Sequence, residues 1–321
     1  MSRVAPTRGS RHFRLESLGR GVYAAVATPT GHGVCNAGIL DLGDCTVVFD
    51  AMLSPAAAVD LARAAERCTG RRPDWVVNSH WHGDHVWGNP SFPQAHIVST
   101  HRTRTEIRRR GAPQLTACRR EFPKLLAGLD RPDSPIPPRE RPGYRGWFEA
   151  AVRLPPSFRI VAPDVTFTEE LVLEGSRRSV RLLSYGGGHS PSDVFAFLPD
   201  ERLLFGGDLA MVGMHPSVTD GWTDRWIAIL RRIERLRPDR VLPGHGHPGT
   251  GRDLELEVDY LRELERIVAA AGRDGLSLQE LRGTPVPDRF SSWLFSPMFP
   301  DNLERVHRLA RPSRRRRRSA A

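Results

Sequence analysis

Three histidines and an aspartate lie within six residues of one another in the segment NSHWHGDH, residues 78–85. They are His80, His82, Asp84 and His85, in the pattern His-x-His-x-Asp-His. On a tight loop after a strand, four such side chains can converge on one point, which a regular helix or strand would not allow. Imidazole and carboxylate are ligand types that zinc, iron and manganese accept. The segment therefore predicts a metal site.

Three further polar residues each follow a stretch that the sequence predicts to be a strand. His189 comes after the glycines of YGGGHS (185–190), which let the backbone turn tightly beside a site. Asp208 ends LFGGD (204–208), and His245 lies in LPGHG (242–246). Alone, each is as typical of a capped turn as of a ligand. Together, at strand ends and in this order, they favour one site shared with the histidine-rich loop.

The elements that must position this loop are predicted from capping residues and short apolar runs. Ser54 as N-cap, Pro55 at the first helical position and Gly70 after the last turn predict a helix between them. The buried run 74–78 predicts a strand that leads into His80, at the carboxyl end where open α/β sheets place ligands. Before the helix, short apolar runs with a turn at Gly43-Asp44 predict strands over 22–26, 34–42 and 45–50.

The second half of the chain repeats this alternation of strands and helices. Apolar residues recur at helical spacing between Trp226 and Leu236, and again between Leu254 and Val268. Two halves of this kind, each delivering polar residues at strand ends, predict an α/β protein with a four-layer αββα sandwich. The strands predicted in this half cover 179–185, 193–198, 203–205 and 240–242.

Changes in composition divide the chain into a main domain and flanking segments. We expect the main domain over 21–272 and, within it, a helix from Thr103 that gives way beyond Gly111 to a surface insertion over 111–156, able to cover the active site. Three aromatic residues after position 290 predict a segment that packs back onto the sandwich. The flanking segments are an N-terminal extension (1–20), this C-terminal packing segment (273–310) and a disordered basic tail (311–321).

Composition narrows the class of protein. Of the 321 residues, 39% are hydrophobic and 26% charged, which allows a sizeable core and argues against wholesale disorder. No apolar run reaches the roughly 20 residues of a membrane span, and residues 1–20 show no apolar signal region. Four scattered cysteines predict neither a disulfide framework nor a thiolate metal site. We therefore expect a cytoplasmic protein without a membrane partner.

The net charge of +10 is uneven, since six of the arginines lie at 311 and 314–318. A basic tail can contact nucleic acid or an anionic membrane. A solvated, disordered terminus accounts for it more simply, so we expect a small-molecule substrate and no nucleic-acid partner.

The motifs together resemble the metallo-β-lactamase superfamily, over roughly residues 22–270. The resemblance implies an αββα sandwich with one or two metal ions between its sheets, here two zinc ions. It also implies a hydroxide shared by the zinc ions that attacks an ester, thioester, lactone, amide or phosphodiester, with Asp84 orienting that hydroxide and accepting its proton. By the same resemblance the first metal would be held by His80, His82 and His189, the second by Asp84, His85 and His245, and Asp208 would bridge both.

The residue types at several of these positions indicate which members of the superfamily the sequence is most similar to. The best-known secreted zinc lactamases have cysteine where this chain has Asp208, and a carboxylate there is similar to glyoxalase II, lactonases and other cytoplasmic members. Glyoxalase II itself usually has paired glycines after the histidine motif, where this chain has VWGN (86–89), and its glutathione-binding domain has no clear counterpart. The sequence is closer to hydrolases in which Gly-Asn follows Asn-x-His-Trp-His-Gly-Asp-His, and we expect no dedicated antibiotic-resistance enzyme.

Two alternatives from other classes remain. Persulfide dioxygenases use the same fold with one iron bound by two histidines and an aspartate at similar positions, so an iron oxidoreductase is the main alternative. A nuclease is a weaker one, suggested by the basic tail and the arginine-rich segment 102–110. The basic residues at 108–110 are explained more simply as a solvated helix face.

Other residues near the motifs are candidates for supporting roles. Asp50, at the end of its strand, is a candidate partner that orients a metal-bound histidine. His215 and His247 are candidates for contacts with substrate, and His32 lies in a loop that could overhang the site. The remaining candidates are expected to pack or to line a pocket: Trp81, Trp87 and Tyr185.

Overall fold

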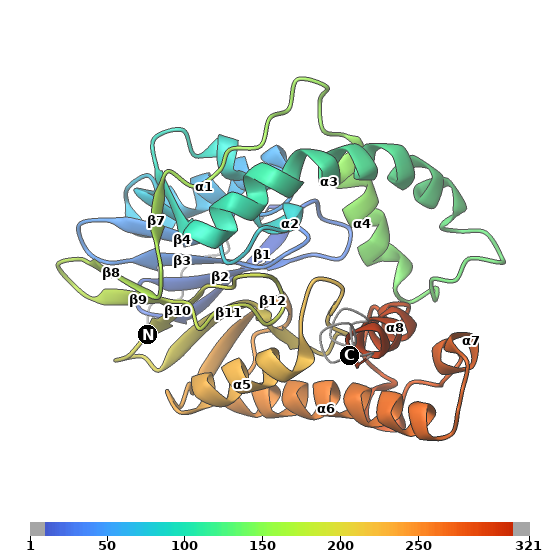
Figure 1. Ribbon diagram of the computed structural model, residues 1–321. Coiled ribbons are helices and arrows are strands. Elements are labelled where there is room, and N and C mark those ends of the chain that lie inside the picture. Colours follow the sequence, from blue (N-terminus) through green and yellow to red (C-terminus); the bar gives the residue numbers. More distant parts are fainter. Residues whose placement is uncertain (1–9, 311–321) are drawn as a thin grey trace, which may run out of the picture.

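The computed structural model describes residues 10–310 of the chain. Two β-sheets stack face to face at the centre, and helices cover the outer face of each sheet (Figure 1). This confirms the four-layer αββα sandwich predicted from the sequence. Residues 1–9 and the basic tail, 311–321, lie outside the described residues.

The first sheet comes from the N-terminal half and has seven strands in the described part of the chain, paired in sequence order. Its first four strands pair antiparallel and its last three join in parallel. The strands are β1 Phe13–Gly19, β2 Val22–Ala27, β3 Ala37–Asp41, β4 Thr46–Phe49, β5 Trp75–Val77, β6 His96–Thr100 and β7 Val165–Phe167.

The second sheet comes from the C-terminal half, and its described strands follow the order β12-β11-β10-β9-β8. All pair antiparallel except β11 and β12, which are parallel. The strands are β8 Glu170–Glu174, β9 Ser179–Leu183, β10 Phe195–Leu198, β11 Leu203–Val212 and β12 Arg240–Gly246.

The helices divide between the two outer faces (Figure 1). In the first half, α1 Pro55–Thr69 and α3 His101–Gly128 contact the first sheet, and α2 Gly83–Val86 and α4 Arg141–Val152 pack against α3. In the second half, α6 Gly251–Arg273 contacts β11, α5 Thr223–Glu234 and α8 Met298–Ala310 pack against α6, and α7 Leu278–Arg282 packs against α8. Two single 3₁₀ turns lie at Asn89–Ser91 and Asp288–Phe290.

Helix α1 has the ends that the sequence predicts. The Ser54 hydroxyl accepts a hydrogen bond from the Ala57 N–H, and Gly70 closes the helix in a left-handed conformation with a φ of 79°. The alanines and Leu61 of its apolar face are buried against the first sheet. The helix therefore sets the path of the chain into β5, the strand that precedes the histidine-rich loop.

Apolar side chains from the two inner sheet faces form the central core. The rings of Phe49 on β4 and Phe205 on β11 meet across the sheets with their centroids 5.8 Å apart. A Cβ atom on Gly38 would lie 2.3 Å from the Phe205 ring, so the sheets approach closely at this point. Close packing brings the carboxyl ends of β5, β11 and β12 to one edge of the sandwich.

The N-terminal boundary differs from the prediction. Residues Phe13–Gly19 form β1, which pairs with β2 from Phe13 opposite Ala27 to Gly19 opposite Val22. The described part of the expected extension therefore belongs to the first sheet. The alternation of apolar and polar residues along β1 is weak, because β1 is an edge strand and most of its side chains are not buried.

The segment expected to be a surface insertion is largely helical. Helix α3 continues to Gly128 through Pro113 and Pro123, and α4 packs against it. Prolines inside a helix normally indicate its end, since each removes a backbone hydrogen bond. Here the buried side chains of Ile107, Leu115 and Phe122 join a core cluster with α4, so tertiary packing outweighs the local signal.

The residues after α6 pack against the helices that lie over the second sheet. Trp293 and Phe299 are buried in the core cluster that α5 and α6 form over the second sheet. Within residues 10–310, every helix is either too short or too polar to cross a membrane.

Candidate metal centre

The histidine-rich loop is held in a tight turn by two asparagines. The Asn78 side-chain amide donates to the His85 carbonyl at 3.2 Å and exchanges hydrogen bonds of 3.0 and 2.8 Å with the Asn89 side chain. A Cβ atom on Gly88 would lie 1.8 Å from the Ala51 carbonyl oxygen, so only glycine allows this close approach. These contacts explain why Asn78 and Gly88-Asn89 flank the histidine motif.

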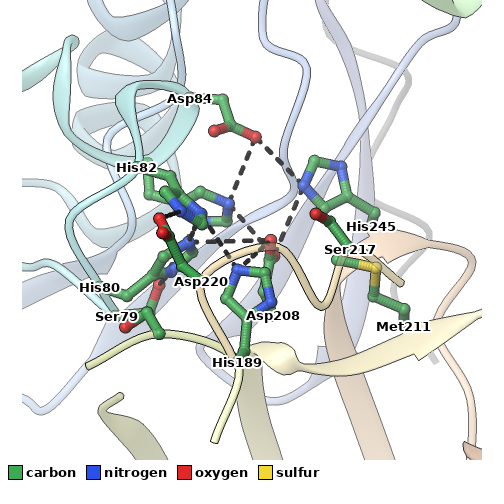
Figure 2. A network of polar contacts seen from close by, with 12 residues as sticks. Ser79, His80, His82, Asp84, His189, Asp208, Met211, Ser217, Asp220 and His245 are labelled. Atoms are coloured by element: carbon green, nitrogen blue, oxygen red, sulfur yellow. Dashed lines mark hydrogen bonds and ion pairs between the residues drawn. The ribbon is translucent and has the colours of Figure 1, made fainter. Parts of the chain in front are cut away.

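Three imidazoles and one carboxylate converge in a first cluster (Figure 2). The Nδ1 atom of His82 lies 2.8 Å from His80 Nε2 and 3.0 Å from His189 Nε2. Asp208 Oδ2 lies 3.8 Å from the first of these Nε2 atoms and 3.4 Å from the second. These four donor atoms come from the loop after β5, the loop after β9 and β11.

A second cluster adjoins the first through the other oxygen of Asp208. Asp84 Oδ2 lies 3.4 Å from His85 Nε2 and 3.1 Å from His245 Nε2. Asp208 Oδ1 lies 3.2 and 3.5 Å from the same two nitrogen atoms. Asp208 therefore faces both clusters, one oxygen to each, and the structure brings together all seven residues that the sequence analysis proposed.

Residue 244 must be small for this arrangement to form. A Cβ atom there would lie 2.0 Å from Asp208 Oδ1, so the glycine before His245 leaves room for the carboxylate. Asp208 itself lies where the register of β11 against β12 shifts, between Gly207 and Met211. The irregular strand turns the Asp208 side chain toward the histidines.

Three of the imidazoles are oriented by a partner on the ring nitrogen that faces away from the clusters. His80 Nδ1 lies 2.9 Å from the Ser79 hydroxyl, and His82 Nε2 lies 3.1 Å from Asp220 Oδ2. His85 Nδ1 lies 2.8 Å from Asp50 Oδ2. Such contacts fix the tautomer and the orientation of a ligating ring. The predicted place of Asp50 beside a site histidine is confirmed.

Burial and charge make the site attractive to a cation. Burial lowers the pKa of His189 to about 3, which keeps this imidazole neutral and able to ligate. Burial opposes the charged form of His245 as well, but Asp208 and Asp84 outweigh it and raise the pKa of His245 to about 10. Burial likewise opposes ionisation of Asp84, but His85 and His245 hold its pKa well below the usual range. The ionised carboxylates hold protons on nearby imidazoles, and a metal ion would displace those protons.

The donor set fits metal ions in both clusters. A tetrahedral zinc with bonds of ~2.0–2.1 Å keeps its ligand atoms ~3.3 Å apart, comparable with the separations in both clusters. Among the described residues, the buried His85 Nε2 and Asp208 Oδ1 atoms have no hydrogen-bond partner. A cation between these two atoms would satisfy both once it has displaced the proton of the imidazole.

A cavity of about 300 Å³ opens beside the clusters. Trp81 lines it, whereas Trp87 is buried in the core below the loop. His215 also lines it, with Nδ1 3.0 Å from the Tyr260 hydroxyl, and His247 lines an adjoining cavity.

Two candidates lie away from the clusters. His32 is buried beside His12 and lies 3.6 Å from a Glu149 carboxylate oxygen. Tyr185 lines a separate cavity beneath the Arg232 guanidinium. The structure therefore gives neither residue a contact with the candidate metal ligands.

No sequence motif indicated two residues of the site, Arg110 and Asp220. Arg110 donates to both oxygens of Asp220, at 2.7 and 2.9 Å, and its guanidinium stacks 3.9 Å above the centre of the Trp81 ring. Arg108 and Arg109 are exposed as predicted, but Arg110 points inward one position later, so the expected solvated face is wrong for this residue. The sequence does not distinguish Arg110 from its neighbours, because it stands in an arginine-rich run. Asp220 has no surrounding motif except a turn-forming Asp-Gly pair.

Comparisons with known proteins point to one family. The family model described as the metallo-beta-lactamase superfamily matches residues 30–245. A metallo-beta-lactamase type 2 of Bacteroides fragilis is 28% identical over 92 residues. That alignment covers 27% of this chain and 37% of the relative, so the chain spans well under two thirds of that protein.

Solved structures share the fold at low sequence identity. A metallo-beta-lactamase from Pontibacter korlensis superposes with a TM-score of 0.56 at 16% identity, over 78% of this chain and 99% of the other. One from Erythrobacter litoralis gives 0.57 at 14%, over 79% and 98%. The metallo-beta-lactamase FIM-1 from Pseudomonas aeruginosa, in a mono-zinc form, gives 0.57 at 12%, over 81% and 98%. These similarities show the fold.

Proposed function

Because the chain belongs to the metallo-β-lactamase superfamily, we propose that it is a zinc-dependent hydrolase of a small-molecule ester, thioester, lactone or amide. The observation that carries this proposal is the placing of Asp208 between two clusters of metal-ligand type, with one oxygen toward each. A carboxylate in this position suits two zinc ions per chain. The mono-zinc form of the FIM-1 neighbour gives further support for zinc as the metal.

The residues of each cluster have distinct roles in this proposal. His80, His82 and His189 would hold one zinc ion, and Asp84, His85 and His245 the other. Zinc bound there supplies a Lewis acid and lowers the pKa of bound water from 15.7 toward ~7. The rings of His80, His82 and His85 are held in place at the nitrogen that faces away from the metal. Their partners there are Ser79, Asp220 and Asp50, in that order.

Asp84 is the residue proposed to handle the proton of the attacking water. Its carboxylate lies in the second cluster and also lines the cavity. An ionised carboxylate at the cavity wall can orient water by hydrogen bonding and accept a proton as attack proceeds. Asp84→Ala is expected to abolish turnover while leaving far-UV circular dichroism unchanged, and retained turnover would refute this role.

Metal content tests the proposal directly. The protein, expressed in medium that offers both zinc and iron, is analysed by elemental mass spectrometry after purification. We expect about two zinc ions per chain, falling to one or none in Asp208→Ala, because that substitution removes an oxygen from both clusters. A panel of thioesters, lactones and β-lactams then identifies the hydrolysed bond. One iron per chain would instead support the persulfide dioxygenase-like oxidoreductase, which oxygen uptake on persulfides would test.

A further inference from the structure

The cavity beside the candidate metal ligands has an apolar wall. The described residues of this wall come from segments far apart in the sequence: the loop before β3, the histidine loop, α4, the end of β11 with the loop after it, and the start of α8 with the loop before it. Their side chains are aromatic, aliphatic or thioether groups, which favour the burial of an apolar ligand group. They are Val34, Trp81, Trp147, Met211, Met214, Phe295 and Met298.

No lysine or arginine is among the described residues that line this cavity. The nearest cation described above, Arg110, already bonds to both oxygens of Asp220 and stacks on Trp81. The non-ligand imidazole in the wall, His215, is kept neutral because burial lowers its pKa to about 4. Gln114 adds one uncharged amide, whose Oε1 atom is buried with no hydrogen-bond partner among the described residues. Apart from the candidate metal ligands, the described wall therefore offers an anionic group on a ligand no cationic side chain.

Two wall residues have strained backbones. Val34 has a φ of 69° and Phe295 a φ of 60°, in the left-handed region that β-branched and bulky residues rarely adopt. Both also border a second cavity of about 540 Å³, so together with Met214 they separate the two spaces. The Phe295 ring packs on Tyr144 with centroids 4.7 Å apart, which helps to hold it in place. Strain of this kind persists only where the surrounding structure enforces it.

We propose that this cavity selects substrates in which the group next to the scissile bond is apolar and uncharged. The inference rests on the proposed function and specifies its substrate class. The apolar group would lie against the methionines, Trp147 and Phe295, and Gln114 would hydrogen-bond a neutral polar atom. A carboxylate beside the scissile bond would be desolvated without a cationic side chain of the wall to pair with it, at a cost in affinity. Phe295 and Met298 lie beyond residues 30–245, so part of this wall comes from outside the family match.

A series of thiols tests the tail preference separately from catalysis. 2-Phenylethanethiol, 3-mercaptopropanoate and 2-mercaptoethanol share a sulfur that binds zinc, and they differ in having an apolar, an anionic or a small polar tail. Binding is measured by calorimetry on the purified protein with its metal content determined. We expect the phenyl thiol to bind about tenfold or more tightly than the anionic thiol, because only its tail matches the wall.

A new charge in the wall should weaken this preference. In Gln114→Lys, an ammonium group on α3 would pair with the carboxylate of 3-mercaptopropanoate, and the ratio of the two dissociation constants should change by about tenfold. Leu125→Lys is the matched control, since it adds the same charge to the same helix at a side chain that is 47% exposed. That control should leave the ratio unchanged. Met214→Lys adds the charge from another segment that lines the same cavity, and it replaces Gln114→Lys if the latter does not fold.

The outcomes separate the two proposals. A protein that purifies without metal and binds none of the three thiols would overturn the proposed function. A metal-loaded protein that binds 3-mercaptopropanoate as tightly as 2-phenylethanethiol would overturn the substrate class alone. A ratio that shifts equally in Gln114→Lys and Leu125→Lys would also overturn it, because the effect would then be one of general charge.

Discussion

Asp50 follows β4 directly and makes two hydrogen bonds at the edge of the site. Its Oδ1 atom accepts from the Ser79 N–H at 2.7 Å, and its Oδ2 atom lies 2.8 Å from His85 Nδ1. Its backbone has a φ of 64°, a conformation that aspartate and asparagine tolerate better than other residues. Asp50 can therefore hold both the loop and the tautomer of His85.

Asp50→Asn is expected to weaken metal binding by about 10- to 100-fold. Asparagine keeps the oxygen for Ser79 and fits the positive φ, but its NH₂ group would oppose the proton on His85 Nδ1 that ligation through Nε2 requires. Zinc titration against a competing chelator measures the change. Asp133→Asn, on an exposed side chain, is the control, and equal affinities for the two variants would remove the role of Asp50.

Glu257 on α6 is a buried carboxyl beside the site. Its Oε2 atom accepts from the Met211 N–H at 3.1 Å, and its Oε1 atom has no partner among the described residues. Burial, helped by the charges of Asp208 and Asp253, raises its pKa well above the usual 4.5. The folded state therefore keeps a proton that the unfolded state loses above pH 4.5, and this group lowers stability as the pH rises toward its folded pKa.

Glu257→Gln should remove that pH dependence. Glutamine keeps an acceptor for the Met211 N–H and carries no titrating proton. The free energy of unfolding of the variant relative to wild type should therefore shift in favour of the variant between pH 5 and pH 8. Urea unfolding of chelator-treated protein measures this. Glu255→Gln, exposed on the same helix, should show no such trend. If the difference in unfolding free energy between Glu257→Gln and wild type did not change with pH, the prediction would be contradicted.

At the scale of elements, α3 connects the outer helical layer to the candidate metal ligands. Arg110 on this helix bonds Asp220, and Asp220 in turn faces His82 Nε2. The buried Glu106, one turn earlier, pairs with Arg102 and Arg109 and lies 4.0 Å from Arg110. The position of α3 therefore bears on the orientation of a ligating ring.

Arg110→Ala is expected to weaken zinc binding by up to about tenfold, because Asp220 loses the bidentate partner that orients it toward His82. Competitive zinc titration measures the loss. Arg108→Ala removes an exposed arginine from the same helix and should leave zinc affinity unchanged. Identical affinities for the two variants would show that α3 does not act on the site through Arg110.

At the scale of the whole molecule, the C-terminal helix supports the loop that follows β11. Asn302 on α8 is buried; it accepts from the Val218 N–H at 3.0 Å, and its amide donates to the Pro216 carbonyl at 2.7 Å. The same amide lies 3.0 Å from the Tyr260 hydroxyl on α6. The loop held in this way carries Asp220 and the cavity residue Ser217. Residues beyond the family match thus brace the site.

Asn302→Leu should lower the free energy of unfolding by about 2–4 kcal/mol. Leucine has a similar size but leaves the buried Val218 N–H and Pro216 carbonyl without partners, and each such group costs about 1–3 kcal/mol. Urea unfolding measures the change. Arg308→Leu, on the exposed face of the same helix, should stay within about 0.5 kcal/mol of wild type. A similar small change for Asn302→Leu would contradict the supporting role of α8.

The sequence by itself determined the features whose signals are local. The His80–His85 motif, the ends of α1, the strand before His189 and the strands that contain Asp208 and His245 can be recognised because spacing and caps act within a few residues. The order of these motifs along the chain then identifies the sandwich. Asp50 could be predicted as well, since the strand that it follows is parallel to the strand that enters the motif.

Only the tertiary structure decided which distant side chains complete the site. Arg110 meets Asp220 across 110 residues of sequence, and Phe295 reaches a cavity built around the loop at residue 80. Such contacts depend on how helices pack, which neither periodicity nor capping specifies. Helix α3 continues past Pro113 for the same reason, because burial of its apolar face against α4 outweighs the loss of a backbone hydrogen bond.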